Sequence, residues 1–311
     1  MSAGAERDNV YGPRIKVVPK YLTTEGWDAA NLALLAGLDL DQWQDTILVE
    51  TMGQRGEEGQ RGDRGLPWAA RHVGILCSGQ NGVEDITLAR ELYELTLAPA
   101  RRRILHTAAH PHAVKTAHSL LADLLTNSDE LKDKVDRICR ASDNLRIEMK
   151  NGSIIAFVSR VSSHHRMTAD LLVLEDAEQL PESTYVAALP TIAHSRHPQV
   201  WMTGTAVDAR VDNHGRVFGN ARRRALAGTD PGLCWIEYSA DDTRLPDDHP
   251  VPDRRGQLLI NPEDPEQWAR ANPGRIPERY IREELNTFRE HVFLTRRLGI
   301  GHWPTPGEET S

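Results

Sequence analysis

Hydrophobic residues in the middle of the chain follow two alternating patterns, one typical of buried strands and one typical of helices. Short apolar runs that predict buried strands occur at 73–77, 104–107, 171–174 and 200–203. Between these runs, the segments 85–97 and 113–125 repeat apolar residues at helical spacing. Strands that alternate with helices indicate a parallel, doubly wound sheet with ligands at the carboxyl ends of its strands. The predicted fold class is therefore α/β, with a mostly parallel central sheet flanked by helices.

The N-terminal part departs from this regular pattern. Residues 1–25 are polar and contain Gly and Pro, which indicates an arm, whereas 26–53 has the apolar spacing of two helices joined at Gly37. The segment 53–67 is rich in glycine and charge, so we expect a mobile loop there.

The later segments complete the expected organisation. Asn151-Gly152 is the dipeptide that best supports a tight hairpin, and 233–238 reads as a further strand. A Pro- and Asp-rich loop then precedes helices expected at 264–272 and 277–297. We therefore expect three parts, namely an N-terminal arm at 1–25, a main domain at 26–240 and a C-terminal helical segment at 241–311.

Composition and charge limit the classes of partner. The net charge of −8 argues against a surface that is basic throughout, and the arginine clusters at 101–103, 222–224 and 296–297 are more simply solvated faces than DNA contacts. Three isolated cysteines form no CxxC pair, so neither a zinc knuckle nor a disulfide framework is indicated. The chain has neither a membrane-length apolar run nor a leader, so we expect a cytosolic protein that does not enter a membrane.

The histidines raise the question of a metal site. They comprise His106, His110, His112, His118 and the pair at 164–165. Their spacing matches no known zinc site, so surface or hydrogen-bonding roles are the favoured interpretation.

The turn after the first buried strand, Ser78-Gly79-Gln80-Asn81-Gly82, is a candidate phosphate-binding loop. A strand, a glycine-containing turn and a helix present backbone N–H groups and a helix N-terminus to a phosphate. Such loops continue with Lys and then Ser or Thr, but here Gly82 is followed by Val83 and Glu84. Taken alone, this segment is better read as an ordinary strand-to-helix turn.

The strand at 171–174 ends in two carboxylates, Glu175 and Asp176. Acidic residues after an apolar strand can hold Mg²⁺ and polarise an attacking water, but they are equally common as helix caps. The strand at 200–203 leads into Gly204-Thr205, which on its own predicts only a turn.

Taken together and in this order, the segments resemble the ATPase domain of the large terminase of tailed phages, specifically the type found in phages of actinobacterial hosts. Leu40-Asp41-Gln42-Trp43-Gln44 resembles the family's adenine-side Trp-Gln motif. The loop at 78–82 resembles the family sequence Pro-Arg-Gln-Asn-Gly-Lys, and Gly204-Thr205 resembles its coupling segment. Trp268-Ala269-Arg270-Ala271-Asn272-Pro273 also fits the family, and the likeness covers about residues 26–303.

The resemblance implies a P-loop NTPase-like fold at 26–240 and a motor that uses ATP and Mg²⁺ to move double-stranded DNA in the host cytoplasm. The implied partners are the phage portal, the small terminase subunit and other copies of the chain in a ring. The implied site residues are Gln44 for adenine, Ser78, Gly79, Gln80, Asn81 and Gly82 for the phosphates, Glu175 for Mg²⁺, Asp176 for the attacking water, Arg166 as an arginine finger, and Gly204 and Thr205 for coupling.

Several of these positions depart from the family pattern. The lysine that binds the β- and γ-phosphates is replaced by Val83, and the Mg²⁺-binding hydroxyl position holds Glu84. The acidic pair, usually Asp then Glu, is reversed at Glu175 and Asp176. We therefore expect weak ATP binding and slow hydrolysis. Because the chain ends near the family's interdomain linker, we also expect any DNA cleavage to come from a separate nuclease subunit.

Three functions are compatible with these observations. The first is a working terminase ATPase, and the second is a catalytically impaired terminase-like protein that serves as a binding or regulatory subunit. The third is an α/β domain of unrelated function, which the number of motifs found in the family order makes the least favoured.

Overall fold

The structure is a computed structural model, and it describes residues 11–56, 65–142, 144–160, 167–209, 214–241, 260–274 and 276–304. The strands of the main sheet are β1 (Ile15–Val17), β4 (His72–Leu76), β5 (Arg103–Ala108), β6 (Val135–Ala141), β7 (Asn144–Met149), β8 (Ile154–Ser159), β9 (Leu171–Leu174), β10 (Gln199–Gly204) and β11 (Leu233–Glu237). They lie in the order β1-β11-β4-β10-β9-β5-β8-β7-β6. The short strands β2 (Thr23–Thr24) and β3 (Gly53–Gln54) form a separate pair.

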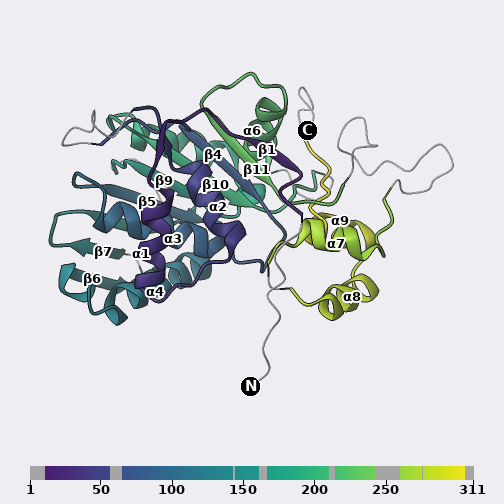
Figure 1. The fold of residues 1–311 in the computed structure, drawn as a ribbon, viewed down its shortest axis with the longest axis horizontal. Coiled ribbons are helices and arrows are strands. Elements are labelled where there is room, and N and C mark those ends of the chain that lie inside the picture. Colours follow the sequence, from purple (N-terminus) through teal and green to yellow (C-terminus); the bar gives the residue numbers. More distant parts are fainter. Residues whose placement is uncertain are drawn as a thin grey trace.

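The helices are α1 (Gly26–Leu35), α2 (Gln42–Thr51), α3 (Val83–Thr96), α4 (Pro111–Asn127), α5 (Glu182–Ala188), α6 (Arg216–Leu226), α7 (Pro265–Ala271), α8 (Glu278–Thr287) and α9 (Glu290–Arg297). Figure 1 shows α1, α2 and α3 lying over one face of the sheet, while α7, α8 and α9 form a small unit at one end. Short 3-10 turns occur at Lys132–Lys134, Ala177–Gln179 and Leu189–Ile192.

The four central strands lie side by side, as the apolar runs predict. In the order β4-β10-β9-β5 every neighbouring pair is parallel, with Leu76 opposite Gly204 and Met202 opposite Leu174. The carboxyl ends of these strands therefore meet at one edge of the sheet. The predicted mostly parallel α/β fold is confirmed.

The runs in these strands are continuously apolar because both faces of the sheet are covered. On one face, Val73 and Ile75 of β4 pack with side chains from α1, α2, α3 and α4. On the other face, Leu172 and Leu174 of β9 pack with Phe218 of α6. A third, smaller cluster around Trp268 joins α7, α8 and α9.

The segment 1–25 is not wholly an arm in the structure, because Ile15–Val17 adds the edge strand β1 antiparallel to β11. Buried Glu237 ties this edge together, since its carboxylate accepts hydrogen bonds from Arg14 and Arg222. The expected loop at 53–67 lies partly outside the described residues, which omit 57–64.

Two further sequence predictions can be compared with the structure. The hairpin at Asn151-Gly152 is present, with β7 and β8 antiparallel and Gly152 at a φ of +84°. The single helix expected at 277–297 is wrong, because the chain turns at Phe288 and Arg289, whose extended backbone separates α8 from α9.

The arginine clusters contain internal ion pairs instead of being only solvated faces. Arg102 contacts Glu94, and Arg222 forms a buried pair with Glu237. Arg297 forms a third buried pair with Glu284. These three arginines therefore form ion pairs within the fold and are not available as a solvated basic surface.

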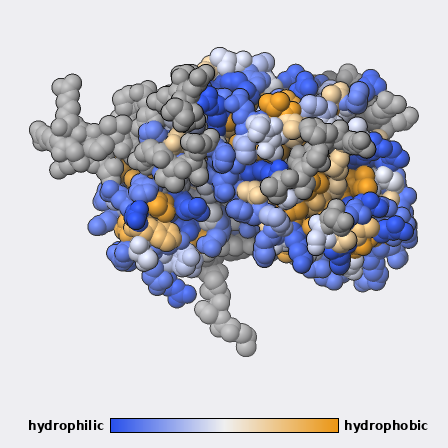
Figure 2. Space-filling model, turned by 180° about the vertical axis from the view of Figure 1, so that it is seen from behind, coloured by the Kyte–Doolittle hydropathy of each residue, from blue (hydrophilic) through white to orange (hydrophobic). Residues whose placement is uncertain are grey.

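The face of the molecule in Figure 2 is largely hydrophilic, with hydrophobic residues exposed in separate patches. Within the part of the chain that the structure describes, every helix is too short or too polar to cross a membrane.

Candidate nucleotide site

The predicted phosphate-binding loop joins β4 to α3. Gly82 takes a φ of +90°, a left-handed conformation that suits glycine, and Gln80 is also left-handed at +66°. The Nδ2 atom of Asn81 donates to the carbonyl of Ser78 at 2.9 Å. The sequence between Ser78 and Gly82 thus forms a tight loop whose shape depends on its own side chains.

Gln44 supports this loop from α2. Its Oε1 atom accepts a hydrogen bond from the backbone N–H of Asp41 at 2.7 Å, so it belongs to the capping box of the helix. Its Nε2 atom donates to the carbonyl of Gly82 at 2.6 Å. Gln44 is fully buried, and this contact places it beside the loop. Its predicted contact with adenine stays a prediction.

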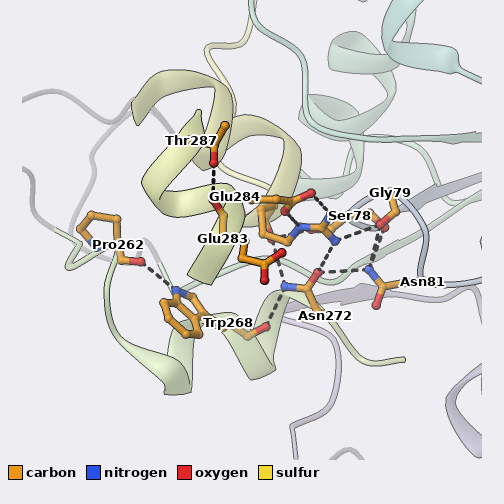
Figure 3. A network of polar contacts seen from close by, with 10 residues as sticks. Ser78, Gly79, Asn81, Pro262, Trp268, Asn272, Glu283, Glu284 and Thr287 are labelled. Carbon is orange, nitrogen blue, oxygen red and sulfur yellow. Dashed lines mark hydrogen bonds and ion pairs between the residues drawn. The ribbon is translucent and has the colours of Figure 1, made fainter. Parts of the chain in front are cut away.

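The C-terminal helical segment also contacts the loop (Figure 3). Asn81 donates to Oδ1 of Asn272 at 3.1 Å, and Nη1 of Arg297 donates to the carbonyl of Gly79 at 3.1 Å. In the opposite direction, the hydroxyl of Ser78 donates to the carbonyl of Arg297 at 2.7 Å. Residues 191 to 219 positions apart in the sequence therefore form one polar network.

The acidic pair lies at the same edge of the sheet as the loop. Neighbouring strands lie about 4.8 Å apart, so the carboxyl ends of β4 and β9, which flank β10, are about 10 Å apart. Burial raises the pKa of Glu84, and the nearby carboxylates of Asp85, Glu175 and Asp176 raise it further. The start of α3 and the acidic pair thus interact electrostatically across this edge.

Glu175 also lies beside a buried histidine. The Nε2 atom of His106 is 3.3 Å from Oε2 of Glu175, and its Nδ1 atom is 2.6 Å from Oε1 of Glu91. Burial alone would lower the pKa of His106, but the two carboxylates raise it to about 10. Burial raises the pKa of Glu91, an effect that His106 opposes. The imidazole therefore links α3 to the acidic end of β9.

Asp176 has a strained backbone that its neighbours hold in place. Its φ of +50° is left-handed, which is uncommon for a residue other than glycine. Its Oδ2 atom accepts the N–H of Ala109 at 3.2 Å, and its carbonyl accepts Nη1 of Arg160 at 3.0 Å. Arg160 also donates to the carbonyl of Glu175. The guanidinium thus fixes the backbone of both acidic residues.

Arg160 is the cation of this turn that sequence reasoning missed. The sequence singles out Arg166 instead, and Arg166 lies outside the described residues. Burial lowers the pKa of Arg160, while Asp176, Glu178 and Glu175 oppose that shift. The only sequence signal for Arg160 is its position at the end of the apolar run that forms β8.

Gly204 and Thr205 meet the same acidic turn. The backbone N–H of Thr205 donates to Oε2 of Glu178 at 3.2 Å. A Cβ atom at Gly204 would lie 2.4 Å from that oxygen and 3.0 Å from the backbone nitrogen of Ala177. Only glycine lets the end of β10 approach the acidic turn this closely. Burial raises the pKa of Glu178, and Asp176 adds to that shift.

The described side chains around Glu175 do not form a complete set of metal ligands. Among the described residues, no group of three or more His, Cys, Asp or Glu side chains is arranged to hold a metal ion. Any divalent cation at Glu175 would therefore need further ligands from a bound phosphate or from water.

Comparisons with known proteins bear on the fold of this chain. No protein-family model matches the chain, and no curated protein matches it. The crystal structure of the HK97 bacteriophage large terminase is similar over 89% of this chain, with a TM-score of 0.68 and 14% identity. The chain has the fold of a large-terminase ATPase domain. The large-terminase ATPase domain of Thermus phage P74-26 also matches, over 86% of this chain and 96% of its own, with a TM-score of 0.53 and 12% identity. This chain covers 55% of the length of the HK97 protein.

Proposed function

We propose that this chain is the nucleotide-binding domain of a phage DNA-packaging motor. The observation that carries the proposal is the placement of the loop at 78–84 and of Glu175 and Asp176 on either side of β10, at the carboxyl edge of the sheet. In doubly wound sheets this edge is where ligands bind. A large-terminase ATPase fold around that edge favours a nucleotide as the ligand.

In this proposal the backbone N–H groups of the loop would bind the phosphates of ATP, and Glu175 would hold Mg²⁺. The bound Mg²⁺ would supply positive charge to the phosphates during transfer. Asp176, oriented by Ala109 and Arg160, would position the attacking water. Glu178 would connect this turn to Gly204 and Thr205, which would couple hydrolysis to movement of DNA.

The residues present fit a nucleotide in shape better than in charge. The loop joins a strand to a helix and has a left-handed Gly82 at the start of α3, which supports a phosphate site at this helix N-terminus. However, the cation expected after Gly82 is replaced by Val83, and Glu84 lies where a phosphate-facing hydroxyl belongs. Burial and the nearby carboxylates raise the pKa of Glu84, so a charged carboxylate is unfavourable at this position.

The partners follow from the same proposal. Double-stranded DNA would be the substrate that moves, and the portal, the small terminase subunit and a ring of identical copies would complete the motor. Hydrolysis would take place in the host cytoplasm.

A second candidate function is a terminase-like subunit that has lost turnover and acts in binding or regulation. The specific observation in its favour is the acidic surrounding of the loop, where the carboxylates of Asp85, Glu175 and Asp176 add to the effect of burial and raise the pKa of Glu84. Glu84 and Asp85 lie in the first turn of α3, where their negative charges can stabilise the helix N-terminus without a bound phosphate.

ATP binding and hydrolysis, measured with and without double-stranded DNA, separate these functions. We expect weak binding, with a Kd of about 100 μM or higher, and turnover well below about 1 per second. Hydrolysis abolished by Glu175→Ala but kept by Glu182→Ala, an exposed carboxylate on α5, would establish a working motor. The double variant Val83→Lys with Glu84→Thr should tighten ATP binding at least tenfold. If it binds no better than the wild type, the loop is not a phosphate site and the proposal fails.

A further inference from the structure

The carbonyl groups of the candidate loop are held by side-chain donors. Asn81 donates to the carbonyl of Ser78, Arg297 to that of Gly79 and Gln44 to that of Gly82, at distances of 2.9, 3.1 and 2.6 Å. In a planar trans peptide the C=O and the following N–H point in opposite directions. Fixing these three carbonyls therefore fixes the N–H groups of residues 79, 80 and 83, each of which points away from the donor that holds the preceding carbonyl.

We propose that Arg297, together with Asn272, is a positioning residue of the C-terminal segment that holds the loop at 78–82 in its anion-binding orientation. This inference rests on the proposed function, because it takes a di- or triphosphate as the ligand of the loop. It goes further by assigning a role in that site to α9 and to the turn after α7, which lie far from the loop in sequence.

Arg297 acts here through its geometry and not through its net charge. Its Nε and Nη2 atoms pair with both carboxylate oxygens of Glu284 at 2.5 and 2.8 Å, which balances its positive charge. The remaining Nη1 donates both to the carbonyl of Gly79 and to Oδ1 of Asn272, at 3.1 and 3.2 Å. The planar guanidinium can make all these contacts at once, whereas an ammonium group cannot reproduce the fork.

Asn272 connects the loop at 78–82 to the C-terminal helices α7 and α9. Its Oδ1 atom accepts from Asn81 and from Arg297, and its Nδ2 atom donates to the carbonyls of Trp268 and Arg297. Asn272 is 8% exposed and Asn81 is 1% exposed, so water cannot readily replace these bonds. Figure 3 shows Asn272 between the helix that carries Trp268 and the loop that carries Ser78, Gly79 and Asn81.

The backbones of the two segments also touch closely. The N–H of Gly274 donates to Oδ1 of Asn81 at 3.2 Å. A Cβ atom at Gly274 would lie 2.7 Å from the carbonyl oxygen of Asn81. The turn after α7 is therefore packed directly against the loop, and displacement of either one must disturb the other.

The test compares Arg297→Lys with Arg296→Lys. Both substitutions keep the positive charge, but Arg296 is an exposed residue of the same helix, α9. Nuclear magnetic resonance order parameters of the backbone N–H groups of residues 79–82 report the loop, and calorimetry with pyrophosphate and with ADP, both without metal, reports the ligand. In Arg297→Lys we expect the order parameters to fall from about 0.85 to below about 0.6, and both affinities to weaken at least tenfold. Arg296→Lys should change neither.

The outcomes separate positioning from charge and from the proposed function. A loop that stays rigid in Arg297→Lys overturns the positioning role, because a retained positive charge would then be sufficient. A loop that loosens with no change in affinity also overturns it. If the wild-type chain binds neither pyrophosphate nor ADP, the nucleotide function fails, while the order parameters still decide whether Arg297 holds the loop.

Discussion

The Nε2 atom of His106 lies 3.3 Å from Oε2 of Glu175, and both side chains belong to the carboxyl edge of the sheet. His106 is fully buried, and its other nitrogen contacts buried Glu91 on α3. The helix that begins at the candidate loop is thus connected through one imidazole to the residue expected to hold Mg²⁺. This connection makes His106 a structural support of the acidic pair.

Replacement of His106 should loosen Glu175. In His106→Gln the carboxylate of Glu91 loses its charged partner in the protein interior, which should cost about 3 kcal/mol of unfolding free energy. Chemical denaturation measures that loss, and a crystal structure of the variant should show the Glu175 carboxylate displaced. His118→Gln is the matched control, because His118 is equally buried and packs on the same Phe157 ring without contacting Glu91 or Glu175. A Glu175 side chain that keeps its position in His106→Gln would contradict this prediction.

Gly204→Ala should separate the end of β10 from the acidic turn. The new Cβ atom would meet Oε2 of Glu178 at 2.4 Å and the backbone nitrogen of Ala177 at 3.0 Å. The carboxylate can move aside, but the hydrogen bond from Thr205 is then lost and the backbone must shift slightly. We expect a loss of about 1–3 kcal/mol in unfolding free energy. Gly79→Ala, where a Cβ atom meets nothing within 4 Å, should leave the stability nearly unchanged.

Trp268→Ala should unfold the C-terminal helical segment before the sheet. Trp268 is 1% exposed, donates to the carbonyl of Pro262 at 2.7 Å and stacks with Arg282 in a cluster separate from the two main cores. Its removal should cost about 3–5 kcal/mol within that cluster. Hydrogen exchange should therefore quicken in α7, α8 and α9, while β4 and β9 keep their protection. Phe288→Ala, at a residue 38% exposed just after α8, should have little effect. Equal loss of protection in the sheet would show that the segment is not an independent unit.

The sheet could be predicted from the sequence because its central strands are buried on both faces and therefore appear as uninterrupted apolar runs. The carboxylates at 175–176 could be placed for the same reason, since they directly follow such a run. The edge strand β6 carries no comparable run, because most of its side chains are exposed or half-buried. Helix α6 was also missed, since its buried positions include Arg222 beside several other arginines.

The supports of the candidate site could not be predicted from the sequence. Arg160, Asn272 and Arg297 reach the loop and the acidic turn only after the chain has folded. Arg160 only follows the apolar run of β8, and Arg297 belongs to a short basic run of a kind that is usually exposed. Pairing across such long sequence separations has no local signature, so the role of these side chains becomes visible only in three dimensions.

Acid should destabilise the sheet edge through Glu237. Its carboxylate is fully buried and accepts hydrogen bonds from Arg222 at 2.7 and 3.0 Å and from Trp235 at 3.0 Å. Burial alone would raise the pKa of Glu237, but Arg222 and Arg14 lower it from 4.5 to about 2. Because the folded pKa lies below the unfolded one, the stabilisation is fully present above about pH 4.5 and is lost as the pH falls towards 2.

The shift corresponds to a stabilisation on the order of 3 kcal/mol at neutral pH, since one pKa unit equals about 1.4 kcal/mol. Glu237→Gln should therefore be less stable at pH 7 and should lose less stability than the wild type between pH 4.5 and 2. Urea denaturation across that range measures both slopes. Glu278→Gln, which removes the partner of an exposed arginine on α8, should follow the wild-type slope. If Glu237→Gln also follows that slope, protonation of Glu237 is not what weakens the contacts of β11 with β1 and α6. Another buried acid must then be responsible.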